Sequence, residues 1–465
     1  MRAQKAPRSG PFARKYRTGA ITGPAWDEGI FMKRVIGLAM GAALACTGAM
    51  VAAQNDTAPA APAAPAAPAA PSANEGDAPK PAPSAFLPTP LGAGPWDFQT
   101  EKAKVHVEVV TKGLDRPWGM AFLPNGDMLV TERPGRLRIV SKAGVLDPTP
   151  IAGLPEIYNV GLAGLMDVVL HPDFAKNRLI YLSYSKVDPA DPKNSTLAVL
   201  RAKWDGSHQL SDVKDIFVAD AWFGKEPVPT RCCGQGPVYG SYGGRMAFDG
   251  EGYLFIASGE RNYGEMAQKP DNHFGKILRL NDDGSVPDDN PYVGDKDWKP
   301  EIWTTGHRNP TGLTVDPDFG EIWSTEFGPR GGDELNRIQR GDNYGWMDVT
   351  QGHHYDDTPA KFIKGEAGFV DPLAVWGPPS ANPGNLTFYH GRKFPGWDGN
   401  LLIAMMNKSL VRVEFDAKGN PSGKQEAMLQ DLKQRLRDVR QGPDGNIYIL
   451  TDEKEGAMLR LTPGK

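Results

Sequence analysis

The chain has few cysteines, little net charge and none of the cysteine motifs that bind zinc or haem. Its 465 residues include only three cysteines, Cys46, Cys232 and Cys233. No CxxC or CxxCH sequence is present, which excludes a zinc ribbon and a covalently attached haem. The formal net charge is −4 without a basic stripe, so no nucleic acid is expected as a partner. A strand–GxGxxG–helix unit is also missing, which argues against a nicotinamide-dependent enzyme.

The first 91 residues are predicted to lie outside the folded domain. The sequence MKR at 32–34 precedes a short apolar run that ends in VAA at 51–53, the pattern of an export signal. We predict that residues 1–53 are an N-terminal extension plus signal peptide, with the true start at Met32, cleavage near Ala53 and a periplasmic or secreted location. The run is shorter and richer in alanine than a good spanning helix, so a membrane anchor is the weaker alternative. Residues 54–91, rich in alanine and proline, are predicted to be a disordered linker.

Cys232 and Cys233 are neighbours in the part of the chain that we expect to be exported. An oxidising compartment favours a vicinal disulfide between them. Adjacent Cα atoms lie about 3.8 Å apart, below the usual disulfide range, so such a bond would be strained. Two free thiols in a loop are the alternative.

From residue 92 to residue 465 the chain shows no long helical apolar period. Short apolar runs alternate instead with turns built from Pro, Asp, Gly or Asn. Six such strand–turn–strand segments recur, at 118–140, 165–185, 244–260, 311–328, 386–407 and 437–453. They predict an all-β fold, a six-bladed β-propeller with long inserted loops, over residues 92–465. A β-sandwich is the alternative. Propellers gather loops around one end of a central channel, where we expect the chemistry.

The stretch EFGPRGGDELNRIQRGDNYGW at 326–346 combines backbone freedom with negative charge. Glu334 offers a hard carboxylate oxygen, and Gly328 and Pro329 leave backbone carbonyls free to turn outward. Oxygen donors without a nearby His or Cys cluster favour Ca²⁺ over zinc. A polar glycine-rich turn is the alternative reading of this stretch.

Two further stretches bring guanidinium groups to strand ends. TTGHRNPTG at 304–312 places Arg308 and Asn309 beside a predicted strand, where an arginine fork suits carboxylates and carbonyl oxygens. QRLRDVR at 434–440 places Arg435 and Arg437 on one face of a strand, where they repel each other unless an anion lies between them. Carboxylates of a ligand would serve, and a solvated outer strand is the alternative.

Taken together, the ordered stretches RPWGMAF, GLMDVVLHPDF, GGRMAFDG, GKILRL, HRNPTG, EFGPRGGDELN, NYGW and RLRDVR span most of 105–463. In these motifs the chain resembles the soluble quinoprotein glucose and aldose dehydrogenases of the glucose/sorbosone dehydrogenase family. The resemblance implies a propeller that binds pyrroloquinoline quinone (PQQ) and Ca²⁺ and oxidises an aldose or related alcohol to a lactone. Since no haem motif is present, electrons would pass to an external acceptor. A monomer or homodimer is expected.

The resemblance also implies roles for individual residues. Gly328 and Pro329 would offer carbonyls to the Ca²⁺ that touches the quinone, and Glu334 and Tyr344 match ligands of a calcium site. The remaining matched residues would face the quinone: Arg308, which would stabilise negative charge on the reduced oxygen, Asn309, Arg435 and Arg437.

Three positions depart from the family pattern. Ser241 stands where the family has its catalytic base, a histidine, and serine has no useful basicity near pH 7. Leu162 replaces a cofactor-binding glutamine. Asn407 replaces a lysine that meets PQQ, with Lys408 one residue away.

These departures leave several functions open. Another imidazole, from His273, His353, His354 or His390, would have to supply the base, with His390 and the 353–354 pair favoured by their loop positions. A disulfide between the neighbouring cysteines would be a stacking surface for the quinone. A PQQ- and Ca²⁺-dependent dehydrogenase is the favoured reading. A degenerate or altered-ligand binding propeller and a Ca²⁺-dependent lactonase are the alternatives.

Overall fold

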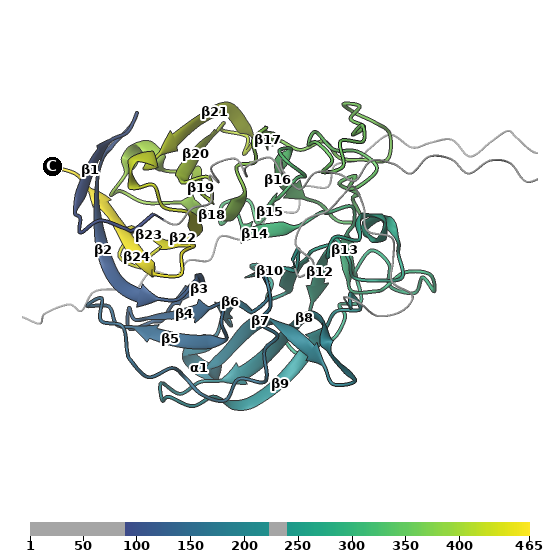
Figure 1. The fold of residues 1–465 in the computed structure, drawn as a ribbon, viewed down its shortest axis with the longest axis horizontal. Helices are drawn as coiled ribbons and strands as arrows, with labels where there is room; N and C mark the ends of the chain where they lie inside the picture. The colour runs from purple at the N-terminus through teal and green to yellow at the C-terminus, as the bar shows by residue number, and fades with distance from the viewer. Residues whose placement is uncertain (1–88, 223–239) are drawn as a thin grey trace, which may run out of the picture. The chain divides into compact units, whose positions relative to one another are not determined.

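The computed structural model describes residues 89–222 and 240–465. These residues form six antiparallel sheets arranged as blades around a central axis (Figure 1), which confirms the predicted six-bladed propeller. The first three blades contain β3 (Pro117–Phe122), β4 (Met128–Glu132) and β5 (Arg136–Val140); β6 (Leu165–Leu170), β7 (Leu179–Asp188), β8 (Asp191–Lys203) and β9 (Ser211–Val218); and β10 (Gly243–Phe248), β11 (Leu254–Ser258), β12 (Lys276–Leu280) and β13 (Ile302–Thr304).

The fourth and fifth blades contain β14 (Pro310–Val315), β15 (Ile322–Glu326), β16 (Asp333–Ile338) and β17 (Ala374–Trp376); and β18 (Pro383–Tyr389), β19 (Asn400–Met405), β20 (Ser409–Phe415) and β21 (Pro421–Met428). The sixth combines β22 (Leu436–Gln441), β23 (Ile447–Thr451) and β24 (Gly456–Pro463) with β1 (Trp96–Gln99) and β2 (Lys104–Leu114). The short helices are α1 (Phe174–Asn177), η1 (Gly264–Gln268), η2 (Pro395–Trp397) and η3 (Gln430–Leu432).

The first strand of each blade in chain order faces the axis. These inner strands are β3, β6, β10, β14, β18 and β22, and each contacts the next around the ring. All six segments predicted from the sequence begin in these strands. The second strands β4, β11, β15 and β23 are buried at every residue. They are enclosed on both faces by neighbouring blades, which explains sequences as apolar as LFIAS and IYILT.

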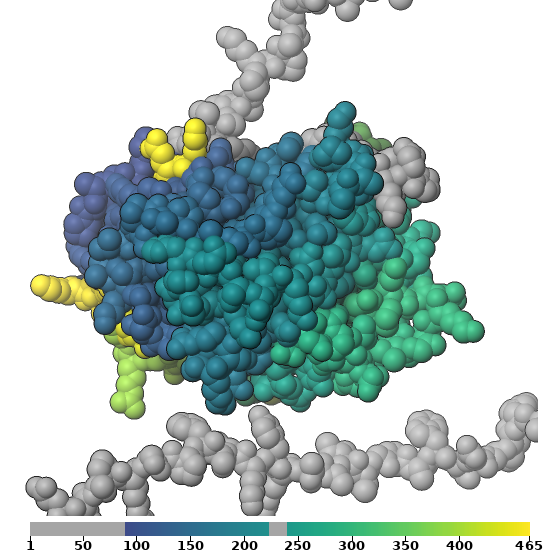
Figure 2. All heavy atoms as spheres, turned by 90° about the horizontal axis from the view of Figure 1, so that it is seen from below, coloured from purple at the N-terminus to yellow at the C-terminus, as the bar shows by residue number. Residues whose placement is uncertain are grey.

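The ring closes by pairing the two ends of the domain. Strand β2 runs antiparallel to β24, from the pair Val105–Pro463 to the pair Leu114–Gly456. In Figure 2 the yellow C-terminal residues accordingly emerge beside the purple segment. Closure in this way leaves the ring without a free gap between its first and last blades.

A buried ion cluster fixes the inner strands to one another. Arg245 of β10 is fully buried and lies 3.1 Å from Asp167 of β6 and 3.4 Å from Asp438 of β22. Arg440 contacts the same two carboxylates, each at 3.2 Å. The Arg245 guanidinium also stacks 4.0 Å from the Trp118 ring of β3. Side chains from four of the six inner strands, β3, β6, β10 and β22, thus meet in one cluster. Because the cluster is buried, water screens its charges little.

In the described ranges, none of the helices has the length and apolar character needed to cross a bilayer. The longest of them, η1, has five residues.

Candidate active site

A cavity of about 500 Å³ opens at the end of the axis where the inner strands begin. Its lining residues come from two kinds of position. Some lie just before inner strands, namely Arg116, Leu162, Ser241, Asn309, Asn382 and Arg435, and others just after second strands, namely Arg133, Asn262, Phe327, Met406 and Asp452. Every blade contributes at least one residue, so the ring itself brings together side chains that are distant in the sequence.

The cavity is strongly cationic. Among the described residues, five arginines line it, Arg116, Arg133, Arg308, Arg435 and Arg437, together with one carboxylate, that of Asp452. So many guanidinium groups around so small a volume favour a small ligand that carries several negative charges.

The negative charge between Arg435 and Arg437 comes from the protein itself, from the carboxylate of Asp452. Asp452 Oδ2 accepts hydrogen bonds from Arg435 at 2.9 Å and from Arg437 at 3.0 Å. Burial raises the pKa of Asp452, but the charges of Arg437 and Arg435 outweigh it and hold the pKa below its ordinary value. The alternative of a solvated outer strand is wrong, because Arg437 is 7% exposed. Its Nε is buried and finds no acceptor among the described residues.

Arg308 and Asn309 are held by backbone and side-chain contacts on the edge of β14. The Arg308 amide donates to Glu326 Oε2 at 2.7 Å, and its guanidinium donates to the Phe327 carbonyl at 3.1 Å. The Asn309 side chain accepts a hydrogen bond from the Gly243 amide at 3.0 Å, which joins the third and fourth blades at the cavity wall. Glu326 is a positioning residue that the sequence analysis missed.

Behind this wall lies a pair of acids, the buried Glu326 and the half-buried Glu334. Asn336 Nδ2 donates to Glu326 Oε1 at 2.9 Å and to Glu334 Oε2 at 3.0 Å. Burial and then the neighbouring charge of Glu326 raise the pKa of Glu334 well above its ordinary value. Asn336 Oδ1 is buried and has no donor in the described part of the chain. Two carboxylates and an unused amide oxygen form an oxygen-donor set suited to a hard cation such as Ca²⁺.

The residues predicted to bind calcium do not lie together: Gly328 lines the cavity, whereas Glu334 and Tyr344 lie behind its wall. The Gly331 and Gly332 carbonyl oxygens lie 2.2 and 2.3 Å from where a Cβ of Gly328 would be, so only glycine fits. The Pro329 carbonyl already accepts a hydrogen bond of 2.7 Å from the His353 amide.

Glu334 and Tyr344 do not line the cavity. The Tyr344 hydroxyl donates to the Arg337 carbonyl at 2.5 Å and accepts from the Gln339 amide at 3.0 Å. Because the hydroxyl is already used in two hydrogen bonds, Tyr344 would coordinate a cation through its backbone carbonyl oxygen. Its ring stacks on His307, with 4.7 Å between centroids, and His307 Nδ1 lies 3.0 Å from Glu326 Oε1.

Asn407 and Lys408 line a second, adjoining groove of about 1030 Å³ and not the central cavity. The groove shares Tyr355, Asn382 and Met406 with the cavity, so the two spaces are continuous. Leu162, by contrast, lies at the cavity wall with 47% of its surface exposed. It therefore borders the space without filling it.

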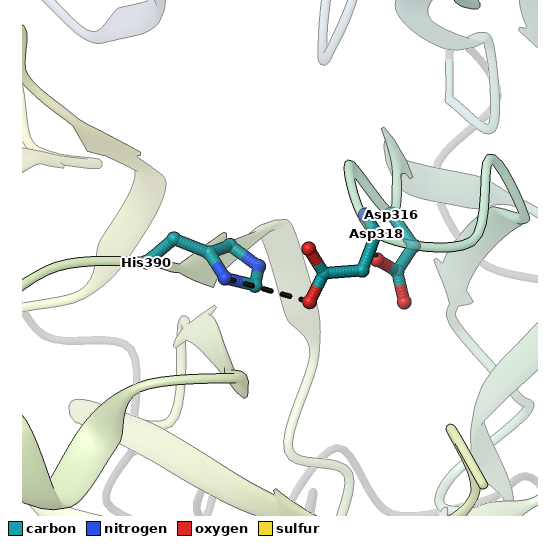
Figure 3. A group of neighbouring side chains, drawn as sticks. All are labelled: Asp316, Asp318 and His390. Atoms are coloured by element: carbon teal, nitrogen blue, oxygen red, sulfur yellow. Dashed lines mark hydrogen bonds and ion pairs between the residues drawn. The ribbon is translucent and has the colours of Figure 1, made fainter. Parts of the chain in front are cut away.

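None of the four histidines considered as a replacement base lines the central cavity within the described residues. His390 is the clearest correction. It follows the far end of β18, beside Asp316 and Asp318 at the far end of β14 (Figure 3), and its Nδ1 lies 3.8 Å from Asp318 Oδ2. Six-residue strands span about 20 Å, so a loop at this end is too distant to act at the other.

The other three histidines have different surroundings. His273 is buried between strands, with Nδ1 accepting the Asp220 amide at 2.9 Å. His354 Nδ1 lies 2.8 Å from Thr358 Oγ1. His353 lines the adjoining groove.

The vicinal cysteine hypothesis concerns residues 232 and 233, which lie outside the described residues, as do residues 1–53 of the signal prediction and 54–88 of the predicted linker. The last three residues of that linker are ordered, since the Thr89 carbonyl accepts a hydrogen bond of 2.7 Å from Gln434 and Leu91 packs against the core.

Comparison with known proteins agrees with this architecture. The family model described as Glucose / Sorbosone dehydrogenase matches residues 114–460. The chain is 41% identical over 364 residues to Aldose sugar dehydrogenase YliI of Escherichia coli (strain K12), covering 78% of this chain and 94% of that protein.

Two solved structures are similar along the same region. The apo-form of the soluble aldose sugar dehydrogenase from Escherichia coli superposes with a TM-score of 0.68 at 38% identity, covering 77% of this chain and all of that chain (100%). The PQQ-bound form of an aldose sugar dehydrogenase from Streptomyces coelicolor has a TM-score of 0.62 at 27% identity, covering 77% and 98%. The fold and these relatives define an oxidoreductase built on a six-bladed propeller. The chain belongs to the glucose/sorbosone dehydrogenase family, as its motifs predicted.

Proposed function

We propose that this chain is an exported PQQ- and Ca²⁺-dependent dehydrogenase that oxidises an aldose or a related alcohol to a lactone and passes the electrons to an external acceptor. The observation that carries the proposal is the cationic cavity of about 500 Å³, which five arginines and one aspartate of the described ranges line. PQQ is a small planar quinone with three carboxylates, and a cavity of this volume falls in the usual range for cofactor sites, about 300–1,000 Å³.

The residues present fit such a cofactor. Arg435 and Arg437 would bind its carboxylates, and the buried Nε of Arg437, which has no acceptor within the described ranges, is one donor for this purpose. Arg308 would lie against its carbonyl side and stabilise negative charge there. When bound, PQQ supplies a two-electron acceptor for the hydride of the sugar, and Ca²⁺ polarises its carbonyl.

The acid pair behind the cavity supports the calcium requirement. Glu334, Glu326 and Asn336 Oδ1 concentrate oxygen donors where burial already raises the pKa of Glu334, so an uncompensated charge there is costly. A cation held there would also fix Glu326 and, through it, the Arg308 backbone. Gly328 is the residue of the predicted set that reaches the cavity itself.

A binding protein without turnover is the alternative that a specific observation favours, because Ser241 lines the cavity where relatives are expected to carry the base. The deciding experiment is calorimetric titration of the purified protein with PQQ, with and without CaCl2, followed by dye reduction over a panel of aldoses. Calcium-dependent binding with dye reduction supports the dehydrogenase. Binding without reduction supports the alternative, and absence of binding refutes the dehydrogenase.

Export has its own test, because it rests on the N-terminal sequence alone. The protein recovered from the periplasm or medium is expected to begin near Gln54, as measured by intact mass and N-terminal sequencing. Recovery only from the cytoplasm with residues 32–53 still attached would contradict export.

A further inference from the structure

Glu260 is a fully buried glutamate that forms no ion pair within the described ranges. It follows β11 and is 0% exposed, and neither of its carboxylate oxygens has a hydrogen-bond donor among the described residues. Its backbone is well anchored, since its amide donates to the Arg308 carbonyl at 2.8 Å and its carbonyl accepts from the Tyr263 amide at 2.8 Å. A carboxylate kept dry and unpaired is costly to folding, so its presence calls for a function.

The segment that carries Glu260 runs directly behind Ser241 at the cavity wall. A Cβ on Gly259 would lie 2.1 Å from the Ser241 carbonyl oxygen and 2.9 Å from Asn309 Oδ1, so only glycine permits this approach. The Arg261 amide donates to the Ser241 carbonyl at 3.2 Å. The Ser241 hydroxyl comes close enough to lower the pKa of Glu260 but donates to Asn262 Oδ1 at 3.2 Å.

Backbone strain gathers at the same place. Ser241, Arg261 and Asn262 have φ values of 52°, 55° and 63°, in the left-handed region that non-glycine residues seldom adopt. Strained conformations of this kind persist where the surrounding structure holds them, most often at functional sites. Here they fix a serine between a ligand cavity and a buried acid.

The charges of two arginines, Arg308 and Arg261, act on Glu260, and both guanidinium groups donate hydrogen bonds to backbone carbonyls. The Arg261 guanidinium donates to the Ser195 and Ala221 carbonyls and stacks 3.6 Å from the Tyr242 ring. The Arg308 guanidinium donates to the Phe327 carbonyl. Burial raises the pKa of Glu260 to about 7, although the Arg308 charge, the Ser241 hydroxyl and the Arg261 charge lower it. A group that gains and loses a proton near neutral pH suits general acid–base work.

We propose that Ser241 and Glu260 together take the proton of the substrate hydroxyl, with Ser241 in contact with the substrate and Glu260 behind it. The inference rests on the proposed function. The O–H bond of the sugar breaks, and its proton passes to Ser241 Oγ while the Ser241 proton passes to the Glu260 carboxylate. The C–H electron pair leaves as hydride to the quinone cofactor, and the carbonyl of the lactone forms. A serine without useful basicity thereby gains the basicity of the acid behind it.

The test compares Glu260→Gln, Ser241→Ala and the control Glu251→Gln, which changes an exposed glutamate on the β10–β11 turn. The first readout needs no cofactor. Infrared difference spectra of the apoprotein should contain a carboxylic acid band that titrates near pH 7 in the wild type, in Ser241→Ala and in the control. Glu260→Gln should lose this band and keep the signals of the other acids with raised pKa, such as Glu334.

The second readout is turnover with PQQ and Ca²⁺. Both site variants should lose about 10²–10⁴-fold in kcat while their PQQ affinity stays within about twofold. The wild-type kcat should rise with pH through about 7, and Glu260→Gln should lose this rise. If Glu260→Gln does not fold, Ser241→Ala decides by the loss of kcat with the infrared titration intact.

The two proposals fail differently. A wild-type protein that neither binds PQQ nor reduces the dye refutes the proposed function, and the inference with it. A wild type that turns over sugar while both site variants keep its rate and pH profile overturns the inference alone.

Discussion

Replacing Glu260 by glutamine should stabilise the apoprotein by an amount that grows with pH. The ordinary pKa of a glutamate is 4.5, and that of Glu260 in the folded protein is about 7. Between these values the folded state keeps a proton that the unfolded chain has released, so unfolding becomes easier as pH rises. Glutamine does not titrate, so the variant escapes this loss.

The size of the effect follows from the two pKa values. Between pH 5 and pH 8 the linkage relation gives a loss of about 2–3 kcal/mol of unfolding free energy from this one group. Most of the loss falls between pH 5 and pH 7, and little is added above pH 8. The difference in unfolding free energy between Glu260→Gln and wild type should therefore widen by about 2–3 kcal/mol over this range.

The assay is urea unfolding followed by tryptophan fluorescence at pH 5, 6, 7 and 8, with midpoints compared at a common slope. Other buried acids titrate in both proteins and cancel in the difference. The exposed control Glu251→Gln should differ from wild type by the same small amount at every pH. A Glu260→Gln difference that is constant within about 0.5 kcal/mol would refute the raised pKa and remove the physical basis for its role as a proton acceptor.

Three further perturbations have definite expected outcomes. Arg437→Met should weaken PQQ binding about 10–100-fold in calorimetry, the value of a charge-assisted hydrogen bond, while the distant surface change Arg392→Gln leaves it unchanged. Arg245→Met should lower the unfolding free energy by about 3–5 kcal/mol, because Asp167 and Asp438 lose their shared cation; a loss below about 1 kcal/mol would mean that water reaches the cluster. Calcium at about 100 times its dissociation constant should stabilise the wild type by about 2.7 kcal/mol, and Glu334→Gln should abolish this gain; an unchanged gain in the variant would place the ion elsewhere.

Most of the fold could be predicted from the sequence, because its signals are local. Each inner strand and the turn after it carry their own alternation and turn residues, as in the Asn125-Gly126 turn between β3 and β4. The closure of the ring carries no such signal. Val105 and Pro463 pair across almost the whole domain, and nothing in either segment names the other as its partner.

The candidate site was predictable where its residues stand next to a recognisable strand. Arg308, Asn309 and Arg435 directly precede or approach inner strands, and all three reach the cavity. Asp452 and Glu260 were missed because TDE and SGE after an apolar strand look like ordinary turns. Burial distinguishes these acids from ordinary turn residues, and burial cannot be read from the local sequence.

The prediction for His390 is wrong for a related reason. A loop position alone does not indicate a catalytic role, because a propeller has loops at both ends of its axis. His390 follows an inner strand, whereas the cavity lies where inner strands begin. The direction of the strand, which the sequence does contain, was the information needed to exclude it.

The arrangement of charge around the cavity separates ligand binding from proton transfer. The arginines at the wall repel one another, and Asp452 relieves this repulsion for two of them while the ligand is absent. An anionic cofactor meets donors that are already positioned, so little reorganisation opposes binding. The acids that do not face the ligand, Glu260 and the Glu326–Glu334 pair, lie behind this wall and would otherwise repel it. Glu260 would receive the substrate proton only through Ser241, and the Glu326–Glu334 pair would affect the cavity only through a bound cation. The Ser241 and Glu334 variants measure these two dependences.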